Sequence, residues 1–179
     1  MEENIKQLQY PIGHFKFPKI VSDELLEEWI TQLENLPSDL TELVKDFSEE
    51  QLSTPYRNGG WTVKQLIHHI ADSHHHSYTR FKWALTEDKP LIKAYEEKDW
   101  SGLLDANTAP INLSLSYLSA LHAKIVYLLK GLSSEDLSKS YMHPEGNVEV
   151  SVLENIGKYA WHGKHHYTHI KALAERKGW

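Results

Sequence analysis

Histidines dominate the chemistry that this sequence can offer. The chain has twelve histidines among 179 residues, and nine of them fall within 68–76 and 162–169. His162 and His166 are four positions apart in a segment of helical periodicity, so their side chains lie one turn apart on the same helix face. Two imidazoles presented in this way can hold a transition metal between them. A third ligand would then come from the other cluster.

The apolar pattern of the last helical segment indicates which of its histidines can face a core. Its stripe consists of Leu153, Ile156, Ala160, Gly163, Tyr167, Ile170 and Ala174. His166 and His162 fall near this stripe, His169 lies further from it, and His165 is almost opposite. We therefore predict that His162 and His166 face the protein interior and that His165 faces solvent. The alternative for the pair is a polar role at the core edge, bonded to backbone or water.

The partner cluster is less decisive. His68 and His69 flank the apolar stripe of their helix on opposite sides, so periodicity leaves both open as the third ligand. His69 shares its side with small and polar side chains that suit the wall of a wet pocket, namely Ser73, Ser77 and Arg80. His74 lies on the stripe itself and is expected in the core. The histidines expected to have only surface or structural roles are His14, His75, His76 and His122.

Capping signals and apolar periodicity predict four long helices. Their expected ranges are 22–47, 62–86, 112–130 with a cap at Asn112 or Ser114, and 151–177. Pro37 lies inside the first helix and should kink or split it. Thr62–Gln65 and Ser151–Glu154 have the spacing of capping boxes, which fixes where the two histidine-bearing helices begin.

The connections indicate how these helices are joined. Residues 1–20 are expected to form an extended arm, and residues 87–111 a long connection. A helix, a short Ser-Glu turn, a breaker-rich loop and a histidine-bearing helix occur in this order twice, which predicts two helical hairpins joined by one crossover. The strand signal at 148–150 is too short to count. We expect an all-α four-helix bundle in a single domain over 1–179.

The composition excludes several classes of protein. The net charge of -6, without a Lys/Arg-rich run, argues against nucleic-acid binding. No apolar run approaches the roughly 18–20 residues of a membrane-spanning helix. The first residues are charged and lack the apolar core of a secretory signal, so a cytoplasmic location is expected. The chain has no cysteine, which excludes disulfides and thiolate ligands.

Several stretches resemble the DinB/YfiT-like family, in particular its YfiT branch from Bacillus-type bacteria. They are Gly59-Gly60-Trp61-Thr62-Val63-Lys64-Gln65-Leu66-Ile67-His68-His69-Ile70-Ala71-Asp72-Ser73-His74, Tyr159-Ala160-Trp161-His162 and His166. The resemblance extends to Tyr10-Pro11-Ile12-Gly13 and thus covers nearly the whole chain. It implies a four-helix bundle, a homodimer and one divalent metal, Zn²⁺ or Ni²⁺. It also places the ligands at His69, His162 and His166.

Three imidazoles leave at least one metal position open, which favours chemistry over a structural role. Zinc can lower the pKa of a bound water to about 7, so a hydrolase using metal-activated water is the leading hypothesis. The alternative within the family is an S-transferase that activates a low-molecular-weight thiol of the bacillithiol type. A non-enzymatic metal-binding bundle, suggested by the surplus histidines at 74–76, and a helical dimerisation module are the other interpretations.

Four further residues are candidates for a role beside the metal. Asp72 could orient an imidazole, although aspartates on helix surfaces are more often solvated. Tyr56 and Arg57 lie before a histidine helix and could shape the pocket or bind an anionic substrate; packing and surface roles are the default. His143 occupies the equivalent loop before the last helix and could carry protons. The sequence contains no phosphate-binding loop or dinucleotide fingerprint.

Overall fold

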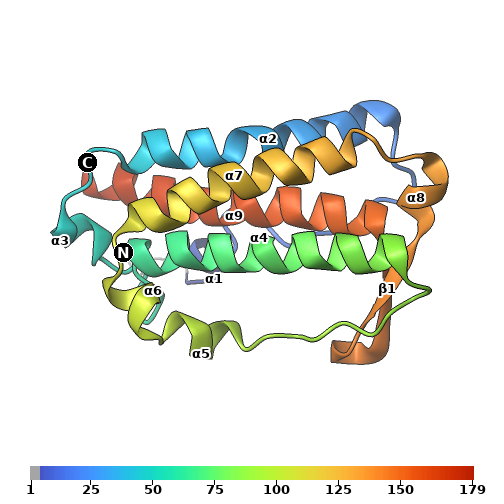
Figure 1. Cartoon of the computed structure of the whole chain (residues 1–179). Helices are drawn as coiled ribbons and strands as arrows, with labels where there is room; N and C mark the ends of the chain where they lie inside the picture. The colour runs from blue at the N-terminus through green and yellow to red at the C-terminus, as the bar shows by residue number, and fades with distance from the viewer. Residues whose placement is uncertain (1–4) are drawn as a thin grey trace.

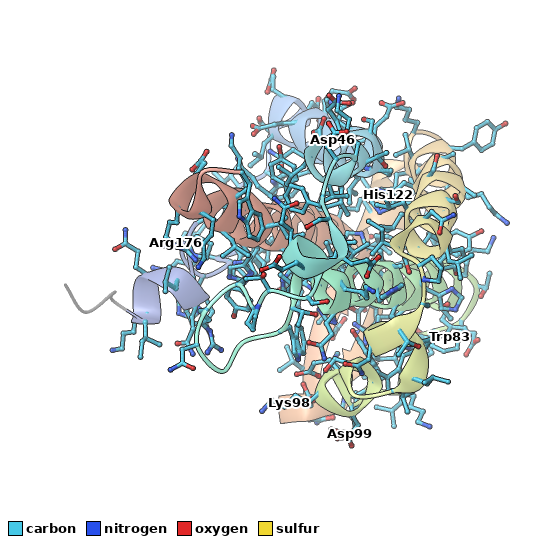
Figure 2. The ribbon with its side chains drawn as sticks, turned by 90° about the vertical axis from the view of Figure 1, so that its left-hand side faces the viewer. Asp46, Trp83, Lys98, Asp99, His122 and Arg176 are labelled. Carbon is cyan, nitrogen blue, oxygen red and sulfur yellow. The ribbon has the colours of Figure 1, made fainter. Side chains whose placement is uncertain are left out.

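Four long helices lie side by side in the computed structural model, which describes residues 5–179 (Figure 1). They are α2 (Asp23–Val44), α4 (Val63–Thr86), α7 (Ile111–Leu129) and α9 (Val152–Lys177). Their apolar faces meet along the axis in two clusters of buried side chains. Figure 2 looks along the helices and shows side chains filling the space between them. The predicted all-α four-helix bundle is confirmed.

The order of the helices around the bundle differs from the expected pair of hairpins. Helix α2 packs against α7 and α9, and α4 packs against the same two helices. Consecutive helices α2 and α4 therefore lie diagonally opposite each other rather than as packed neighbours. Figure 1 shows that α4 and α7 run in one direction and that α2 and α9 run in the other. The hairpin prediction was wrong because the long crossover inserts α7 between α2 and α4.

Local capping explains where the helices begin. The Thr62 hydroxyl accepts from the Gln65 backbone N–H and the Gln65 side chain accepts from the Thr62 N–H, which is the predicted capping box. Reciprocal caps also begin the two short Ser-Glu helices, α3 (Glu49–Leu52) and α8 (Ser134–Ser138). Helix α7 begins at Ile111, earlier than predicted; Pro110 occupies its N-cap position and makes no side-chain capping bond.

Pro37 does not split α2, which continues from Asp23 to Val44. Proline has no backbone N–H, so the Leu33 carbonyl one turn earlier loses its usual helical donor. That carbonyl accepts a hydrogen bond from the ring of His122 on α7 instead. The proline therefore frees a buried acceptor inside the bundle.

The crossover is more ordered than the expected loop. It contains α5 (Glu97–Ser101) and α6 (Leu104–Thr108), both packed on α4. Before α9, strands β1 (Ser140–His143) and β2 (Val148–Ser151) form an antiparallel hairpin around the 3-10 turn η1 (Glu145–Asn147). The segment 148–150 was wrongly dismissed as too short for a strand; it is stabilised by pairing with residues 140–143.

The N-terminal segment covers the outer face of α9. The expected extended arm is partly wrong, since α1 (Ile5–Gln9) is helical; residues 1–4 lie outside the described part. The ring of Tyr10 lies 5.9 Å from that of His165, centroid to centroid. Among residues 5–179, no helix is both long and apolar enough to cross a membrane.

Candidate metal centre

Three histidine side chains meet between α4 and α9. The Nε2 atoms of His69 and His162 are 3.3 Å apart. The ring of His166 lies 4.9 Å from that of His69 and 4.5 Å from that of His162, measured between centroids. All three offer a ring nitrogen within 4.8 Å of the others. The structure thus brings together the three residues that the resemblance places at a metal.

The donor set fits a zinc-type ion. Two nitrogens bound to one tetrahedral zinc are about 3.3–3.4 Å apart, given Zn–N distances of about 2.0–2.1 Å. Burial lowers the pKa of His69 to about 4, and burial together with neighbouring histidines lowers the pKa of His162 and His166 well below its usual value. The three imidazoles are therefore neutral near pH 7, which is the form that binds metals.

A chain of hydrogen bonds behind His162 determines which of its nitrogens faces the centre. The Nδ1 of His162 is 3.2 Å from Nε2 of His74, and Nδ1 of His74 is 3.0 Å from Nε2 of His122. The last ring contacts the Leu33 carbonyl, which only accepts, so His122 must carry its proton on Nδ1. The Nε2 of His122 is then an acceptor, so His74 donates to it from Nδ1 and accepts at its own Nε2. His162 donates from Nδ1 and keeps the Nε2 lone pair free for a metal.

A second chain acts on His166. The Nε2 of His169 is 3.1 Å from the backbone carbonyl of Gln9, so the ring donates there and its Nδ1 becomes an acceptor. His166 Nδ1 lies 3.3 Å from this acceptor and carries the proton of that bond. The Nε2 lone pair of His166 is thus also left free. For His69, the polar neighbour at Nδ1 is the Tyr95 hydroxyl at 3.5 Å.

His165, His166 and His169 also have ring nitrogens within 4.8 Å of one another. This group shares His166 with the first, and the contact between His169 and His166 is the hydrogen bond just described. In the group at His69, His162 and His166, the Nε2 lone pairs of His162 and His166 are free, whereas in this group the contact between His166 and His169 uses Nδ1 of both rings.

A cavity of about 400 Å³ opens onto the three histidines. Beside them it is lined by Trp61, Tyr95 and Trp161. Further along the same cavity lie Arg80, His143 and Lys158. The centre is therefore accessible to a small molecule, and its histidine end has aromatic walls.

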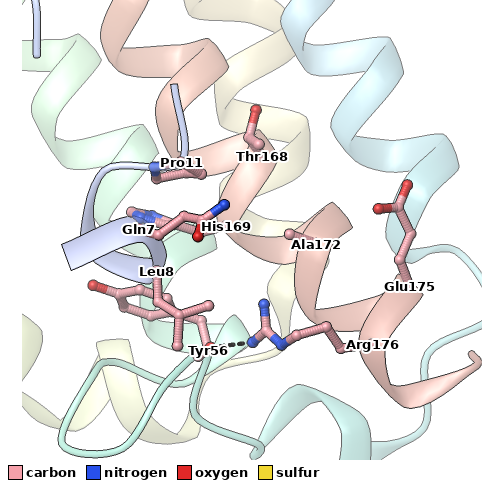
Figure 3. Close-up of a pocket in the computed structure, with 9 residues that line it drawn as sticks. All are labelled: Gln7, Leu8, Pro11, Tyr56, Thr168, His169, Ala172, Glu175 and Arg176. Atoms are coloured by element: carbon pink, nitrogen blue, oxygen red, sulfur yellow. Dashed lines mark hydrogen bonds between the residues drawn. The ribbon is translucent and has the colours of Figure 1, made fainter. Parts of the chain in front are cut away.

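Of the other four candidates, His143 lines this cavity and three do not. Tyr56 lies behind His169 with its ring 4.1 Å away, in a separate cavity of about 620 Å³ beside α1 (Figure 3). Arg57 donates to the Tyr56 hydroxyl and to a loop carbonyl. Asp72 lies on the side of α4 near α6, where burial and the charge of Asp105 raise its pKa to about 6.

Three histidines lie in more interior positions than the sequence predicted, and a fourth, for which a structural role was expected, is fully buried. His165, expected in solvent, is buried against Trp161 beneath the N-terminal segment, and His169 is buried beside α1. His76 is half-buried because its ring stacks on Tyr95 of the crossover. His122 is 1% exposed and belongs to the chain behind His162. Among the sequence signals, only Pro37 could have indicated the role of His122, because a proline inside a helix leaves one carbonyl without its helical donor.

The two neighbouring histidines on α4 point in different directions. His68 points away from the centre, with Nδ1 2.7 Å from the Ser114 hydroxyl and Nε2 3.2 Å from the Ala109 carbonyl. His69 points into it. His74 is fully buried, as expected of a core histidine.

Close relatives are named for metal-dependent hydrolysis. The chain is 49% identical to "Putative metal-dependent hydrolase OB0782" of Oceanobacillus iheyensis, over 96% of this chain and 98% of that protein. It is 47% identical to a "Putative metal-dependent hydrolase" of Bacillus cereus strain 03BB102, over 98% of this chain and all of the relative.

Solved structures share the architecture. YfiT from Bacillus subtilis, described as a probable metal-dependent hydrolase with an unusual four-helix bundle topology, superposes with a TM-score of 0.94 at 43% identity, covering 97% of this chain and 99% of YfiT. The four-helix bundle protein TT2238 superposes with a TM-score of 0.56 at 18% identity, over 82% of this chain and 98% of that one, and shows the fold alone. The DinB superfamily pattern matches residues 32–170. This chain therefore belongs to the DinB superfamily.

Proposed function

We propose that this protein is a metal-dependent hydrolase whose divalent ion, Zn²⁺ or Ni²⁺, is held by His69, His162 and His166. The observation that carries the proposal is the convergence of three neutral imidazoles on a cavity that leaves room for a further ligand. Structural zinc sites are usually closed by four protein ligands, so an open three-histidine set favours catalysis. The names of the relatives support the same class of reaction.

The chain's own residues have separable tasks in this proposal. When bound, the ion supplies Lewis-acid chemistry that lowers the pKa of a water and polarises a carbonyl. The hydrogen bonds behind His162 and His166 hold the ligand rings in one tautomer. Trp61 and Trp161 line the cavity beside the histidines and exclude bulk water. His143, which lines the cavity, is placed to carry protons between the site and solvent.

Transfer of a low-molecular-weight thiol is the second candidate. It is favoured by an open site in a chain that has no cysteine to compete for the ion. A coordinating thiol loses its proton, so the same ion would generate a thiolate nucleophile. An ester and amide panel tests the first candidate. A panel that pairs such thiols with electrophiles tests the second.

A metal buffer without catalysis is less well supported. The surplus histidines that suggested it have other surroundings, because His74 bonds to two histidines and His76 stacks on Tyr95. We therefore expect one tight site per chain instead of several weak ones. Homodimerisation, which the resemblance implies, stays part of the proposal and can be measured by light scattering.

The test is the metal content of tag-free protein measured by elemental mass spectrometry. We expect about one divalent ion per chain in the wild type and almost none in His166→Ala. The matched control is His75→Ala, an exposed histidine on α4, which should keep the ion. Full occupancy in His166→Ala, with circular dichroism showing an intact helical fold, would contradict the assignment.

A further inference from the structure

The cavity that opens onto the three histidines contains a buried positive charge, which has no counter-ion in the described part of the chain. Arg80 on α4 is 5% exposed and lines the cavity. Its guanidinium donates to the Tyr159 hydroxyl at 3.1 Å and also interacts with the Tyr141 hydroxyl, but its Nε has no hydrogen-bond partner. No carboxylate of residues 5–179 forms an ion pair with it. A buried guanidinium in this state is costly unless something pairs with it.

A second cation adds positive charge to this part of the cavity. Lys158 on α9 lines the same cavity, where it reaches solvent at the mouth. Partial burial and the charge of Arg80 lower the pKa of Lys158, and the same two effects, followed by the charge of Lys158, lower the pKa of His143. The carboxylates that line the cavity, Glu97 and Glu145, are exposed, and neither forms an ion pair with Arg80. The charges of Glu154 and Glu145 act on Lys158, where they partly oppose the lowering of its pKa.

Both cations lie on the same side of the histidines. Arg80 follows His69 by eleven residues, or about 16 Å along α4, and Lys158 precedes His162 by one turn. Because α4 and α9 run in opposite directions, these two displacements point the same way (Figure 1). The cavity of about 400 Å³ thus has a histidine end and a cationic end, and its size suits a small molecule.

We propose that the Arg80 end is an anion-binding subsite, which takes a carboxylate or phosphate group of the substrate while the reacting bond lies at the histidines. The free Nε–H belongs to the planar guanidinium fork that matches two oxygens of such a group. Lys158 adds a point charge at the mouth. The assignment of the anion to a substrate rests on the proposed function, whereas the anion site itself rests only on the cavity and its charges.

The test is isothermal titration calorimetry with two probes, inorganic phosphate and malonate, at constant ionic strength and on protein of measured metal content. The variants are Arg80→Met, His166→Ala and the double variant, with Lys130→Met as an exposed cationic control. We expect Arg80→Met to weaken anion binding about 30-fold or more without loss of metal. His166→Ala should lose metal and keep an anion affinity that the double variant loses.

Wild-type affinity in Arg80→Met, or no binding of either probe by the wild type, would overturn the subsite. If Arg80→Met does not fold, Arg80→Lys takes its place; it keeps the charge without the fork, and unchanged affinity would also overturn the proposal. A wild type that holds no metal but shows Arg80-dependent anion binding would refute the proposed function while supporting the subsite. The two failures are therefore distinguishable.

Discussion

The chain of hydrogen bonds behind His162 makes a specific prediction for His74→Leu. His74 is fully buried and bridges His162 and His122 through its two ring nitrogens. Leucine has a similar volume but cannot form either bond. The variant therefore separates hydrogen bonding from packing at a position that does not touch the proposed ion.

Two effects of this substitution can be given a size. Loss of the partner that orients a metal-binding histidine typically lowers metal affinity about 10–100-fold, or about 1.4–2.7 kcal/mol. The substitution also leaves one ring nitrogen of His162 and one of His122 buried without a partner, at about 1–3 kcal/mol each. The free energy of unfolding should therefore fall by about 2–6 kcal/mol.

Zinc affinity can be measured by competition with a chromophoric chelator, and stability by urea unfolding. The matched control is His75→Leu, the exposed neighbour on the same helix, for which both values should stay near wild type. His74→Gln offers an amide acceptor and donor and should recover part of the metal affinity. A folded His74→Leu protein with wild-type zinc affinity would refute the role of this chain.

Three other predictions concern stability. In metal-free protein, the free energy of unfolding should fall as the pH drops from about 6.5 to about 4. Burial lowers the pKa of His69 to about 4, so over this range the unfolded state binds a proton that the folded state does not. The resulting loss of stability is about 3 kcal/mol for this residue. Urea unfolding across this range checks it, and a flat profile would contradict it. Gly157→Ala should lower the stability of the fold by up to about 2 kcal/mol. The added Cβ would lie 2.8–3.0 Å from the rigid Trp29 ring, and this strain exceeds the gain in helix propensity. A higher melting temperature would count against this packing. Asp72→Asn should keep the bound metal and gain stability at pH 7. Burial and the charge of Asp105 raise the pKa of the Asp72 carboxyl to about 6, so its charged form is disfavoured. Loss of metal in elemental analysis would instead indicate that Asp72 takes part in the metal site.

Local signals determined much of this fold. Capping residues such as Thr62 and Gln65 act within one turn of helix, so their effect can be predicted without knowing the tertiary structure. The spacing of His162 and His166 likewise fixed their relative direction. Periodicity gave His69 only a slight edge over His68, and the resemblance favoured His69; in the structure its Nε2 lies 3.3 Å from that of His162.

The errors arose where contacts depend on distant segments. The helical wheel treated His165 as an outer residue because it considers only the bundle, but the N-terminal segment adds a further layer over that face. His122 had no motif because its role depends on α7 packing between α2 and α4, opposite the carbonyl that Pro37 frees. The β1–β2 hairpin was missed for a different reason: each strand has only four residues, too few for alternation to identify either one alone.

X-ray absorption spectroscopy of zinc-loaded, tag-free protein tests the central claim most directly. The account predicts a first shell containing three imidazole nitrogens at about 2.0–2.1 Å and a further light-atom ligand that does not come from histidine. In His166→Ala, any zinc that remains should show fewer imidazoles. A shell closed by four histidines, or a wild-type spectrum unchanged in His166→Ala, would contradict a centre built from His69, His162 and His166.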